Sequence, residues 1–445
     1  MLYKGRNRIK DISTDLLLFG PMLIYKLACD VGYWVLISWN TEVYSADFNS
    51  VKFCIGLLWC IVLYFAIDLN GKKASAFLLY FFFLLQIIPI TTLYSLGNDN
   101  SVYYNTVCLA VLLCELFVRF LNSKAGVIRK ESLSVLMIFG IVGLTLLLLV
   151  QMIRIYGKPN STALNFYNVY DLRASSKSLG KLMNYLLSWT MAVFLPLFMA
   201  RSVVGRKYLF TALCCAVFLL IYLYTGHKTY LFAAPLVLVV SVWSGRPDSF
   251  REFFLCFCAG VALLVILALI EIDKTHGLLN RIFSYFVRRS MFVPANNKFK
   301  YYDYFSTHPK LGIYGIFPRK LVPVNSVYEN IPYTYEISRI YYGKPEMNSN
   351  TGFLAEGYMR FGHFGTFFVL FLFSVILKLI DRFAERTSYQ LAVGFFSYAV
   401  FSLADAHLID SLFFGPWMFL VLILLFYKGD QDREEHTVLS PSATG

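Results

Sequence analysis

The chain has 445 residues, of which 58% are hydrophobic and only 15% are charged. A soluble protein cannot bury so much apolar surface, so the composition excludes an ordinary soluble domain and indicates a polytopic membrane protein. The formal net charge of +13 does not indicate a nucleic-acid partner, because the basic residues fall at the ends of apolar stretches, as in membrane proteins. The nine cysteines lie inside apolar stretches without metal-ligand spacing, so we expect no metal or other cofactor.

Twelve apolar stretches follow one another along the chain, and a helix needs roughly 17 to 25 apolar residues to cross a bilayer. We therefore predict an all-α polytopic membrane protein with about twelve transmembrane helices. The predicted spans are residues 16–39, 51–68, 74–94, 102–121, 132–153, 182–200, 208–225, 229–243, 253–271, 351–377, 388–404 and 412–427. The predicted organisation is 1–271 with the first nine spans, 272–350 as a large external loop, 351–428 with the last three spans, and 429–445 as a cytoplasmic tail.

Lysines and arginines fall in every second connection between the predicted spans, whereas the short connections at 40–50, 95–101 and 405–411 carry none. Because basic connections stay in the cytoplasm, this alternation predicts that both termini are cytoplasmic. Two long connections, 154–181 and 272–350, are then external although they are basic. We expect amphipathic helices in them, and an anionic ligand nearby is the simplest reason for their charge. Ordinary solvation or contact with lipid headgroups is the alternative.

The segment Arg281–Ser290 carries three arginines. At helical spacing Arg281, Tyr285 and Arg288 share one face, and Arg289 lies beside it. Guanidinium groups bind phosphate oxygens in bidentate fashion, so Arg288 and Arg289 are candidate phosphate ligands. The alternative is a helix that lies in the membrane interface and whose arginines only reach toward water.

Two further cations lie in other predicted external connections. Asp171 and Arg173 occur together in the first long loop, where Arg173 is a candidate phosphate ligand oriented by its neighbour, or else half of a salt bridge. The sequence predicts a tight turn at 226–228, between the seventh and eighth spans. Such a turn would hold Lys228 at the membrane surface near an anionic headgroup, or simply anchor the helix there.

Aromatic residues surround two candidate bases in the second long loop. Tyr301 and Tyr302 precede Asp303, and His308 follows one turn later. Aromatic faces bind sugars, and they also anchor proteins at membrane interfaces. Asp303 and His308 are candidate general bases, although a lone histidine in a loop is usually only solvated.

The segment 350–365 leads from this loop into the tenth predicted span. Glu356 and Arg360 are four residues apart, so they share a helix face at the end of that span. An ionisable residue there is costly unless it faces water or the protein interior, which makes the pair a functional candidate. A purely structural ion pair is the alternative. We expect a short turn near the C-terminus to line the same cavity with three ionisable residues, Asp405, His407 and Asp410.

Five of these stretches carry a resemblance, namely VYDLR at 169–173, the turn at 226–228, the run 288–294, YYDYFS at 301–306 and NTGFLAEGYMRFGHFG at 350–365. Together with the many spans, they resemble the Wzy-type oligosaccharide repeat-unit polymerases, which make O-antigen and capsule. The resemblance implies an inverting glycosyltransferase of the bacterial inner membrane that works at the periplasmic face without metal or nucleotide. The sequence contains no Gly-rich phosphate loop, which agrees with nucleotide-free chemistry.

The resemblance implies that a growing glycan passes from its undecaprenyl pyrophosphate to a sugar hydroxyl of a new lipid-linked repeat unit. We assign Glu356 first, and then Asp303 and His308, as the base for that hydroxyl. The pyrophosphate ligands are then Arg173, Lys228, Arg288, Arg289, Arg339 and Arg360. The sugar-binding residues are Asp171, Tyr301, Tyr302 and Asn350. Membrane lipids and a polysaccharide chain-length regulator are further expected partners.

A ligase, a flippase and a non-catalytic scaffold are the alternatives to a polymerase. The related O-antigen ligases carry a His-Asn pair where this chain has Asn350 and Thr351, which disfavours a ligase. A lipid-linked oligosaccharide flippase needs cationic groups along a path through the bilayer, and only Lys26, Asp30 and Glu115 are charged away from the predicted outer face. A non-catalytic scaffold would tolerate replacement of the loop arginines and carboxylates.

Overall fold

The computed structural model describes residues 2–39, 43–69, 73–120, 135–160, 179–246, 248–273, 277–316, 328 and 332–426. Every regular element among these residues is a helix, and none of them forms a strand. The prediction of an all-α protein is therefore confirmed for the described part of the chain.

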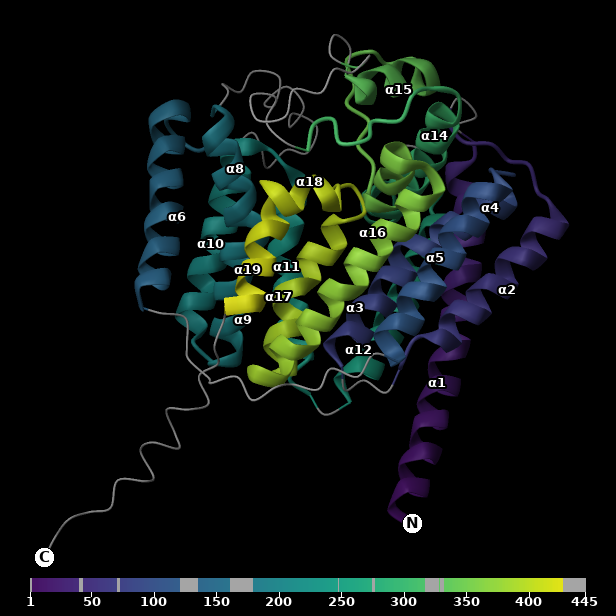
Figure 1. Cartoon of the computed structure of the whole chain (residues 1–445), viewed down its shortest axis with the longest axis horizontal. Helices are drawn as coiled ribbons and strands as arrows, with labels where there is room; N and C mark the ends of the chain where they lie inside the picture. Colours follow the sequence, from purple (N-terminus) through teal and green to yellow (C-terminus); the bar gives the residue numbers. More distant parts are fainter. Residues whose placement is uncertain are drawn as a thin grey trace, which may run out of the picture. The chain divides into compact units, whose positions relative to one another are not determined.

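Figure 1 labels most of the α-helices, and in the described part of the chain four short segments, named η, have the wider turns of a π-helix. In chain order the elements are α1 (Leu2–Gly32), η1 (Tyr33–Ile37), α2 (Ser50–Ala66), α3 (Ala74–Phe82), η2 (Phe83–Ile87), α4 (Ile88–Leu96), α5 (Ser101–Phe120), α6 (Val135–Tyr156), α8 (Lys181–Trp189), η4 (Thr190–Phe194), α9 (Leu195–Val204), α10 (Tyr208–Thr225), α11 (Lys228–Trp243), α12 (Ser249–Ile270), α13 (Leu278–Phe283), η5 (Ser284–Phe292), α14 (Val293–Thr307), α15 (Tyr333–Tyr342), α16 (Phe353–Arg386), α17 (Tyr389–Ser402), α18 (Leu408–Phe413) and α19 (Pro416–Phe426).

The chain folds into two compact units, each assembled from separate stretches of sequence. Unit 1 consists of Met1–Asn122, Asp248–Leu377 and Val400–Phe413, and unit 2 consists of Ser123–Pro247, Lys378–Ala399 and Phe414–Gly445. The long helix α16 and the helix α17 each begin in one unit and end in the other. All candidate site residues that the structure describes belong to unit 1, except Lys228, which begins α11 in unit 2.

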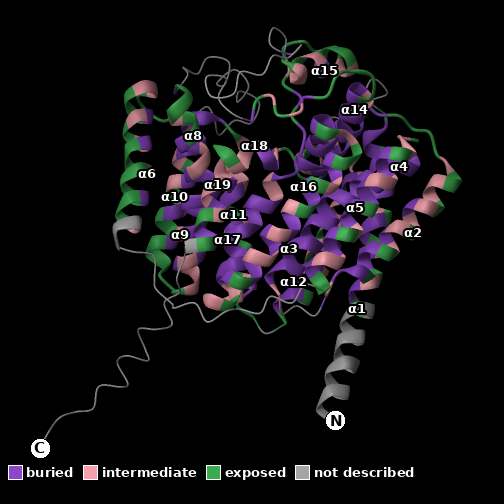
Figure 2. Ribbon diagram, in the orientation of Figure 1, coloured by how far each residue is buried: buried purple, intermediate pink, exposed green. Residues whose placement is uncertain are grey.

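The continuous helix α3–η2–α4 forms the centre of unit 1. Every residue from Ala74 to Leu96 is buried, which Figure 2 shows as a purple ribbon at α3. Aromatic rings of α12 pack against it, with the ring of Phe254 4.8 Å from that of Phe77 and 4.6 Å from that of Tyr80. A helix that is apolar on all sides is suited either to a protein core or to contact with lipid, and the packing around this helix places it in the core of unit 1.

The π-helical segments have a common sequence signal. Each of η2, η4 and η5 is followed by an α-helix whose second residue is a proline, namely Pro89, Pro196 or Pro294. Proline lacks a backbone N–H, and its ring collides with the carbonyl oxygen four residues earlier. The turn before the proline therefore widens, and the helix continues instead of ending.

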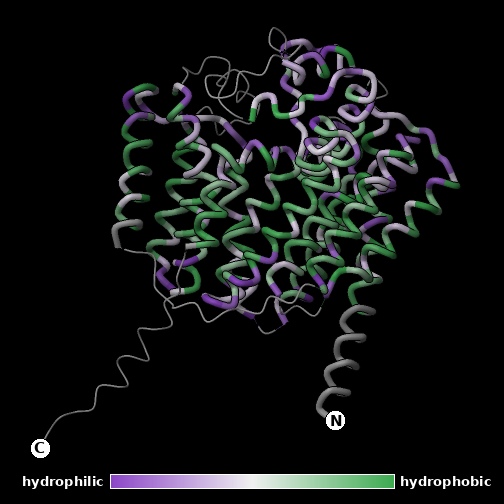
Figure 3. The backbone as a smooth tube through the Cα atoms, viewed as in Figure 1, coloured by the Kyte–Doolittle hydropathy of each residue, from purple (hydrophilic) through white to green (hydrophobic). Residues whose placement is uncertain are grey.

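Among the described residues, eight helices are long and apolar enough to cross a membrane, and Figure 3 shows hydrophobic residues along them. They are Leu17–Ile37, Ala74–Leu96, Ser101–Phe120, Ile138–Tyr156, Lys181–Val204, Tyr208–Thr225, Ser249–Ile270 and Phe353–Arg386. Three shorter apolar helices cover Ser50–Ala66, Lys228–Trp243 and Pro416–Leu425, and α17 covers the remaining predicted stretch. The protein is thus a helical membrane protein, while its full number of spans stays a prediction.

The segment predicted as the large external loop contains a helix of the core. The elements α13, η5 and α14 run continuously from Leu278 to Thr307. Ten residues of α14 are buried, including Lys298, and α14 packs on α4 and α15. A polar segment is thus buried here, because the polar side chains of α14 have hydrogen-bond partners inside the unit.

The helix α16 is broken near its start. Gly362 has φ 66° and ψ −151°, a backbone conformation that is almost restricted to glycine. The break frees carbonyl groups that a continuous helix would use. The carbonyl of Met359 accepts from the N–H of Leu311 (2.9 Å), and that of Arg360 accepts from the N–H of Gly312 (3.1 Å). The short first part of α16 is thereby fixed to the segment that follows α14.

Candidate functional site

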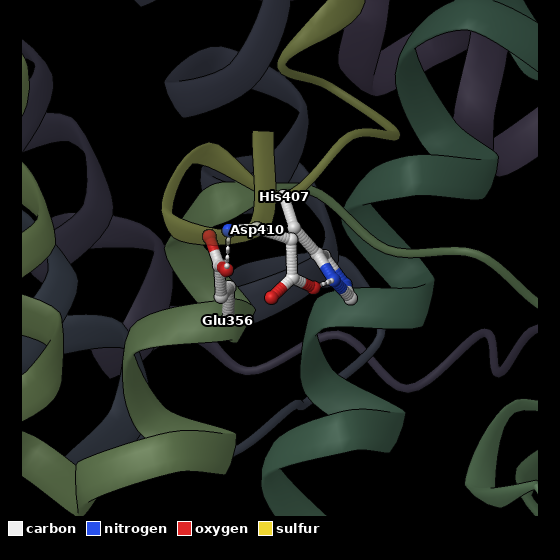
Figure 4. Close-up of side chains that lie close together, drawn as sticks. All are labelled: Glu356, His407 and Asp410. Atoms are coloured by element: carbon white, nitrogen blue, oxygen red, sulfur yellow. Dashed lines mark hydrogen bonds and ion pairs between the residues drawn. The ribbon is translucent and has the colours of Figure 1, made fainter. Parts of the chain in front are cut away.

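Glu356 is the centre of a buried polar group in unit 1. Its side chain is fully buried, and its carboxylate accepts three backbone hydrogen bonds from the first turn of α18. The N–H groups of Leu408, Ile409 and Asp410 lie 2.6, 3.0 and 3.2 Å from its oxygens, one of which Figure 4 draws. The first N–H groups of a helix have no partner within the helix, so Glu356 acts as the cap that holds α18 against α16.

Arg360 joins this carboxylate to two other segments. Its Nε lies 3.4 Å from Glu356 Oε1, and its terminal nitrogen pairs with Asp410. The other terminal nitrogen donates to the carbonyl oxygens of Gly312 and Tyr314, each at 2.9 Å. Because the guanidinium is only 2% exposed, these partners satisfy it in place of water. We call Glu356, Arg360, His407 and Asp410 the latch.

His407 completes the latch at its exposed edge. Its Nδ1 lies 2.8 Å from Asp410 Oδ2, and the two side chains are 16% and 33% exposed. Burial favours the neutral imidazole, but the hydrogen bond to Asp410 and the nearby carboxylate of Glu356 outweigh it and raise the pKa of His407. Burial also disfavours charge on Asp410, but His407 and Arg360 outweigh it and hold its pKa below the usual value.

Three residues of the latch have the composition of a metal site. Glu356, His407 and Asp410 each present one ligand atom, and these atoms lie within 4.8 Å of one another (Figure 4). The carboxylates are already occupied, however. Glu356 accepts from the backbone of α18, and Arg360 places its positive charge between the two carboxylates. This arrangement fits a buried ion-pair network and not a cation site.

Asp405 lies in the same turn but has a different environment. Its side chain is exposed, yet burial raises its pKa, while Lys298 and Arg289 oppose that rise. The Asp405 side chain thus has exposed surface, while charged groups of the protein still act on it. The turn that carries it is fixed to α16 because Phe353 donates its N–H to the carbonyl of Leu403 (3.4 Å).

Lys298 is a buried amine directly beneath this turn. Its side chain has no exposed surface, and its Nζ donates to Gln86 Oε1 (2.8 Å) and to the carbonyls of Pro294 (3.1 Å) and Ala404 (3.2 Å). Burial lowers the pKa of Lys298 to about 7, and Asp405 raises it in part. The amine therefore connects the centre of unit 1 to the turn that carries Asp405.

Arg288 and Arg289 belong to the π-helical segment η5. Arg288 Nε donates to Ser284 Oγ at 2.9 Å. Both arginines lie near the hydroxyl of Tyr44, whose pKa burial raises to about 12 against their influence. Arg289 is exposed and also acts on Asp405. We call Arg288, Arg289, Lys298 and Asp405 the basic cluster.

The helical face predicted for Arg281, Tyr285 and Arg288 needs a correction. The prediction assumed α-helical spacing, but the chain is π-helical from Ser284 to Phe292. A turn of a π-helix holds more than four residues, so residues four apart still share a face but residues three apart do not. Arg288 therefore leaves the face that Tyr285 occupies. The segment does not lie apart as a surface helix either, because Val287 and Met291 are buried in unit 1.

Asp303 of α14 belongs to a second group of ionisable residues, together with Lys300 of α14 and Asp99. Burial raises the pKa of Asp303, and Lys300 opposes the rise. Burial raises the pKa of Asp99, between α4 and α5, to about 7, with Lys300 opposing and Asp303 adding to the shift. Lys52 donates to the carbonyl of Asp99 at 2.6 Å. Asp99 and Lys300 gave no signal in the sequence, because only the packing of α14 on α4 brings them together.

His308, a predicted base, and Arg339, a predicted pyrophosphate ligand, contact residues of their own helical segments. The ring of His308 stacks on Tyr304 with centroids 4.0 Å apart, and its Nδ1 lies 2.8 Å from the Tyr304 carbonyl oxygen. Arg339 forms an exposed ion pair with Glu336, 2.5 Å between the nearest atoms. Each of these contacts lies within one helix or at its end, so neither residue is drawn toward the latch or the basic cluster by a described contact.

Three of the predicted sugar-binding residues, Tyr301, Tyr302 and Asn350, lie among the described residues. Tyr301 has no exposed surface, and its hydroxyl donates to the carbonyl of Ser349 at 2.7 Å. The ring of Tyr302 is 8% exposed and stacks on Tyr103 with centroids 4.9 Å apart. Asn350 is exposed. Burial of the two tyrosines makes them supports for α14, and Asn350 is the member of this set with a surface open to a ligand.

Three of the predicted residues cannot be placed with the others. Lys228 follows the predicted tight turn, which is confirmed because α10 ends at Thr225 and α11 begins at Lys228, but it belongs to unit 2. Asp171 and Arg173 lie outside the described residues.

The prediction that Asp405, His407 and Asp410 lie near Glu356 is supported for Asp410 by a hydrogen bond from its N–H to Glu356. For His407 it is supported because ligand atoms of the two side chains lie within 4.8 Å of each other. The importance of Lys298 was missed, because nothing in the sequence distinguishes it from the solvated lysines around it. No protein-family profile, curated protein sequence or solved structure matches the chain. The function must therefore be inferred from the geometry of the latch and of the basic cluster.

Proposed function

We propose that the protein is a glycosyltransferase that polymerises undecaprenyl-pyrophosphate-linked oligosaccharide repeat units into O-antigen or capsular polysaccharide. The observation that carries the proposal is the basic cluster, in which Arg289 and Lys298 act on the carboxyl group of Asp405. Cationic groups beside a carboxyl group suit a reaction in which a diphosphate leaves and a hydroxyl must lose its proton.

In the proposed reaction the oxygen of an acceptor sugar hydroxyl attacks the anomeric carbon of the donor glycan. A new glycosidic bond forms, and the bond from that carbon to the lipid pyrophosphate breaks with inversion. Arg288 and Arg289 bind the departing pyrophosphate, whose negative charge grows as the bond breaks. The hydroxyl proton passes to the carboxylate of Asp405, whose raised pKa suits proton transfer near neutral pH better than an ordinary aspartate would.

This assignment changes the expected role of Glu356. Its carboxylate accepts three backbone N–H groups and faces Arg360, so its lone pairs are already in use. We propose that Glu356 and Arg360 are positioning residues that hold the turn of Asp405. Asp303, with Asp99 and Lys300, remains a proposed contact for the acceptor sugar, and Arg339 a proposed peripheral contact.

The remaining parts of the proposal follow from the sequence. The basic cluster would face the periplasm of a bacterial inner membrane, with both chain termini in the cytoplasm. Donor and acceptor would reach it from the bilayer as lipid-linked substrates. A chain-length regulator is a proposed partner in the same membrane.

The test uses cells whose own copy of the protein is deleted and replaced by a variant. We expect Asp405→Asn and Arg289→Ala to shorten the glycan ladder on a gel to single repeat units, whereas Lys344→Ala retains long glycans. Lys344 is a suitable control because it is an exposed cation of the same polar segment. Long glycans from Asp405→Asn and Arg289→Ala at normal protein levels would contradict the proposal.

A binding measurement separates ligand recognition from catalysis. Purified Arg289→Ala protein is expected to bind undecaprenyl pyrophosphate roughly tenfold more weakly than the wild type, because a charge-assisted hydrogen bond is lost. Asp405→Asn should bind it as well as the wild type does. Equal binding by wild type and Arg289→Ala would remove Arg289 from the phosphate site.

A lipid-linked oligosaccharide flippase is the second candidate. The observation in its favour is the ion pair of Lys26 and Asp30 inside α1, to which Thr92 of α4 donates at 2.7 Å. This group is fully paired and isolated, whereas a path through the bilayer needs a series of such sites. Deletion distinguishes the two candidates, because loss of a polymerase leaves single repeat units outside the membrane and loss of a flippase leaves none.

A further inference from the structure

Glu115 is a carboxyl group inside α5 for which the proposed reaction has no use. Its side chain is 1% exposed, and neither carboxyl oxygen has a hydrogen-bond partner. The helix α5 is one of those long and apolar enough to cross a membrane. By contrast, Lys26 and Asp30 in α1 are paired with each other and with Thr92. Glu115 therefore differs from these other deeply buried ionisable residues of unit 1.

The neighbours of Glu115 supply no counter-charge. On α5 itself, the thiols of Cys108 and Cys114 are the titratable groups near it, and Cys60 of α2 lies next to Cys108. One turn later, Arg119 directs its guanidinium to α2, donating to the carbonyls of Phe65 (3.0 Å) and Ala66 (3.2 Å). The helices α2 and α4 pack on α5, and among the described residues no charged group acts on Glu115.

An ionised carboxylate without donors is strongly unfavourable in such a place, and a buried acid responds by taking up a proton. We propose that Glu115 is a proton-binding site within the membrane, held as a neutral carboxylic acid at neutral pH. A hydrophobic carbodiimide that enters between the helices would react with this acid. The acid proton passes to a carbodiimide nitrogen, and the carboxyl oxygen bonds to the central carbon. An acyl shift to nitrogen then gives a stable N-acylurea. The reaction has no leaving group, so the mass of Glu115 increases by the full mass of the carbodiimide.

The test treats the folded protein in detergent with dicyclohexylcarbodiimide between pH 6 and pH 8 and locates the adduct by peptide mass spectrometry. We expect the adduct on Glu115, and no adduct at that peptide in Glu115→Gln. Glu346 is the matched control, since it is exposed and should react only with a water-soluble carbodiimide and an added amine. An unmodified Glu115 in folded protein whose Glu346 reacts in this way would overturn the proposal.

A second measurement does not depend on access of the reagent. The unfolded chain releases the glutamate proton above a pH of about 4.3, whereas the folded protein retains it. Rising pH therefore favours the unfolded chain. We expect the thermal unfolding midpoint of the wild type to fall between pH 5 and pH 8, and that of Glu115→Gln to fall less, with Glu346→Gln following the wild type. Parallel curves for wild type and Glu115→Gln would show that the folded protein does not hold this proton.

Discussion

At the scale of single residues, Glu356 is a buried carboxylate whose oxygens are occupied by partners within the protein. It combines a helix cap with an ion pair, because the N–H groups of α18 and the guanidinium of Arg360 meet at one side chain. Asp405, in the turn just before α18, keeps a solvent-accessible carboxyl group. The two residues therefore differ in how many hydrogen bonds their carboxyl oxygens already accept, and not only in how deeply their side chains are buried.

Replacing one member of the latch is expected to be costly for stability. Glu356→Gln leaves Arg360 in a buried site with a weaker partner, and it brings amide N–H groups toward the N–H donors of α18. Loss of one partner of a buried ion pair typically costs roughly 3–5 kcal/mol. We expect a lower unfolding midpoint for Glu356→Gln in detergent, measured by the loss of helical circular dichroism.

The exposed pair of Glu336 and Arg339 on α15 provides the control for this prediction. Its spacing along the helix is similar, but solvent screens it, so Glu336→Gln should leave the midpoint almost unchanged. Equal effects of Glu356→Gln and Glu336→Gln would mean that the latch does not contribute to the stability of unit 1.

At the scale of elements, the widened turns before prolines decide which side chains α14 buries. A regular helix across Pro294 would be interrupted by the missing N–H and the ring of the proline. The π-helical turns of η5 accommodate both, and they also rotate Arg288 and Arg289 relative to the buried face of α14. The position of the basic cluster therefore depends on a proline that lies outside it.

The break in α16 gives a prediction at the same scale. Gly362→Ala places a side chain at φ 66° and ψ −151°, which we expect to cost about 1–3 kcal/mol of unfolding free energy. Gly365→Ala should also destabilise the protein, because a Cβ there would lie 2.0 Å from the carbonyl oxygen of Gly357. Unfolding in increasing denaturant measures both changes.

The matched control for the break is Gly143→Ala in α6. A Cβ at Gly143 meets nothing within 4 Å, and alanine has the better helix propensity. We expect this variant to be as stable as the wild type or slightly more stable. If Gly362→Ala behaved in the same way, the broken conformation of α16 would not be a requirement of the fold.

At the scale of the whole molecule, the latch predicts how stability changes with pH. The raised pKa of His407 stabilises the folded form below the ordinary histidine value of about 6.5, and this contribution disappears as the pH rises through the raised value. The lowered pKa of Asp410 contributes above about 3.9 and is lost as the pH falls through the lowered value.

The latch should therefore contribute most between about pH 4 and pH 6.5. We expect His407→Asn to lower the unfolding midpoint in this interval and to have less effect at pH 9, where the wild-type imidazole is less protonated. A constant difference between the two proteins from pH 5 to pH 9 would show that protonation of His407 does not support the fold.

The sequence predicted the helices well, because each apolar stretch is an extended signal to which many residues contribute. It also predicted that Glu356 and Arg360 share a helix face, which their ion pair confirms, while the catalytic role of Glu356 and the phosphate-binding role of Arg360 stay predictions. It could not separate Lys298 from solvated lysines, or show that Tyr301 is buried, because both facts depend on the packing of α14 against helices distant in sequence. The α-helical face assumed for Arg288 was wrong for a local reason, namely the widened turns before Pro294.

The interruption of α16 also bears on the order in which unit 1 assembles. Leu311 and Gly312 donate to carbonyl groups that become available where the first turns of α16 end at the break. The same turns present Glu356 to the N–H groups of α18. We expect these three segments to become protected from hydrogen exchange together during refolding. The end of a helix, and not a loop, would then organise the last part of unit 1.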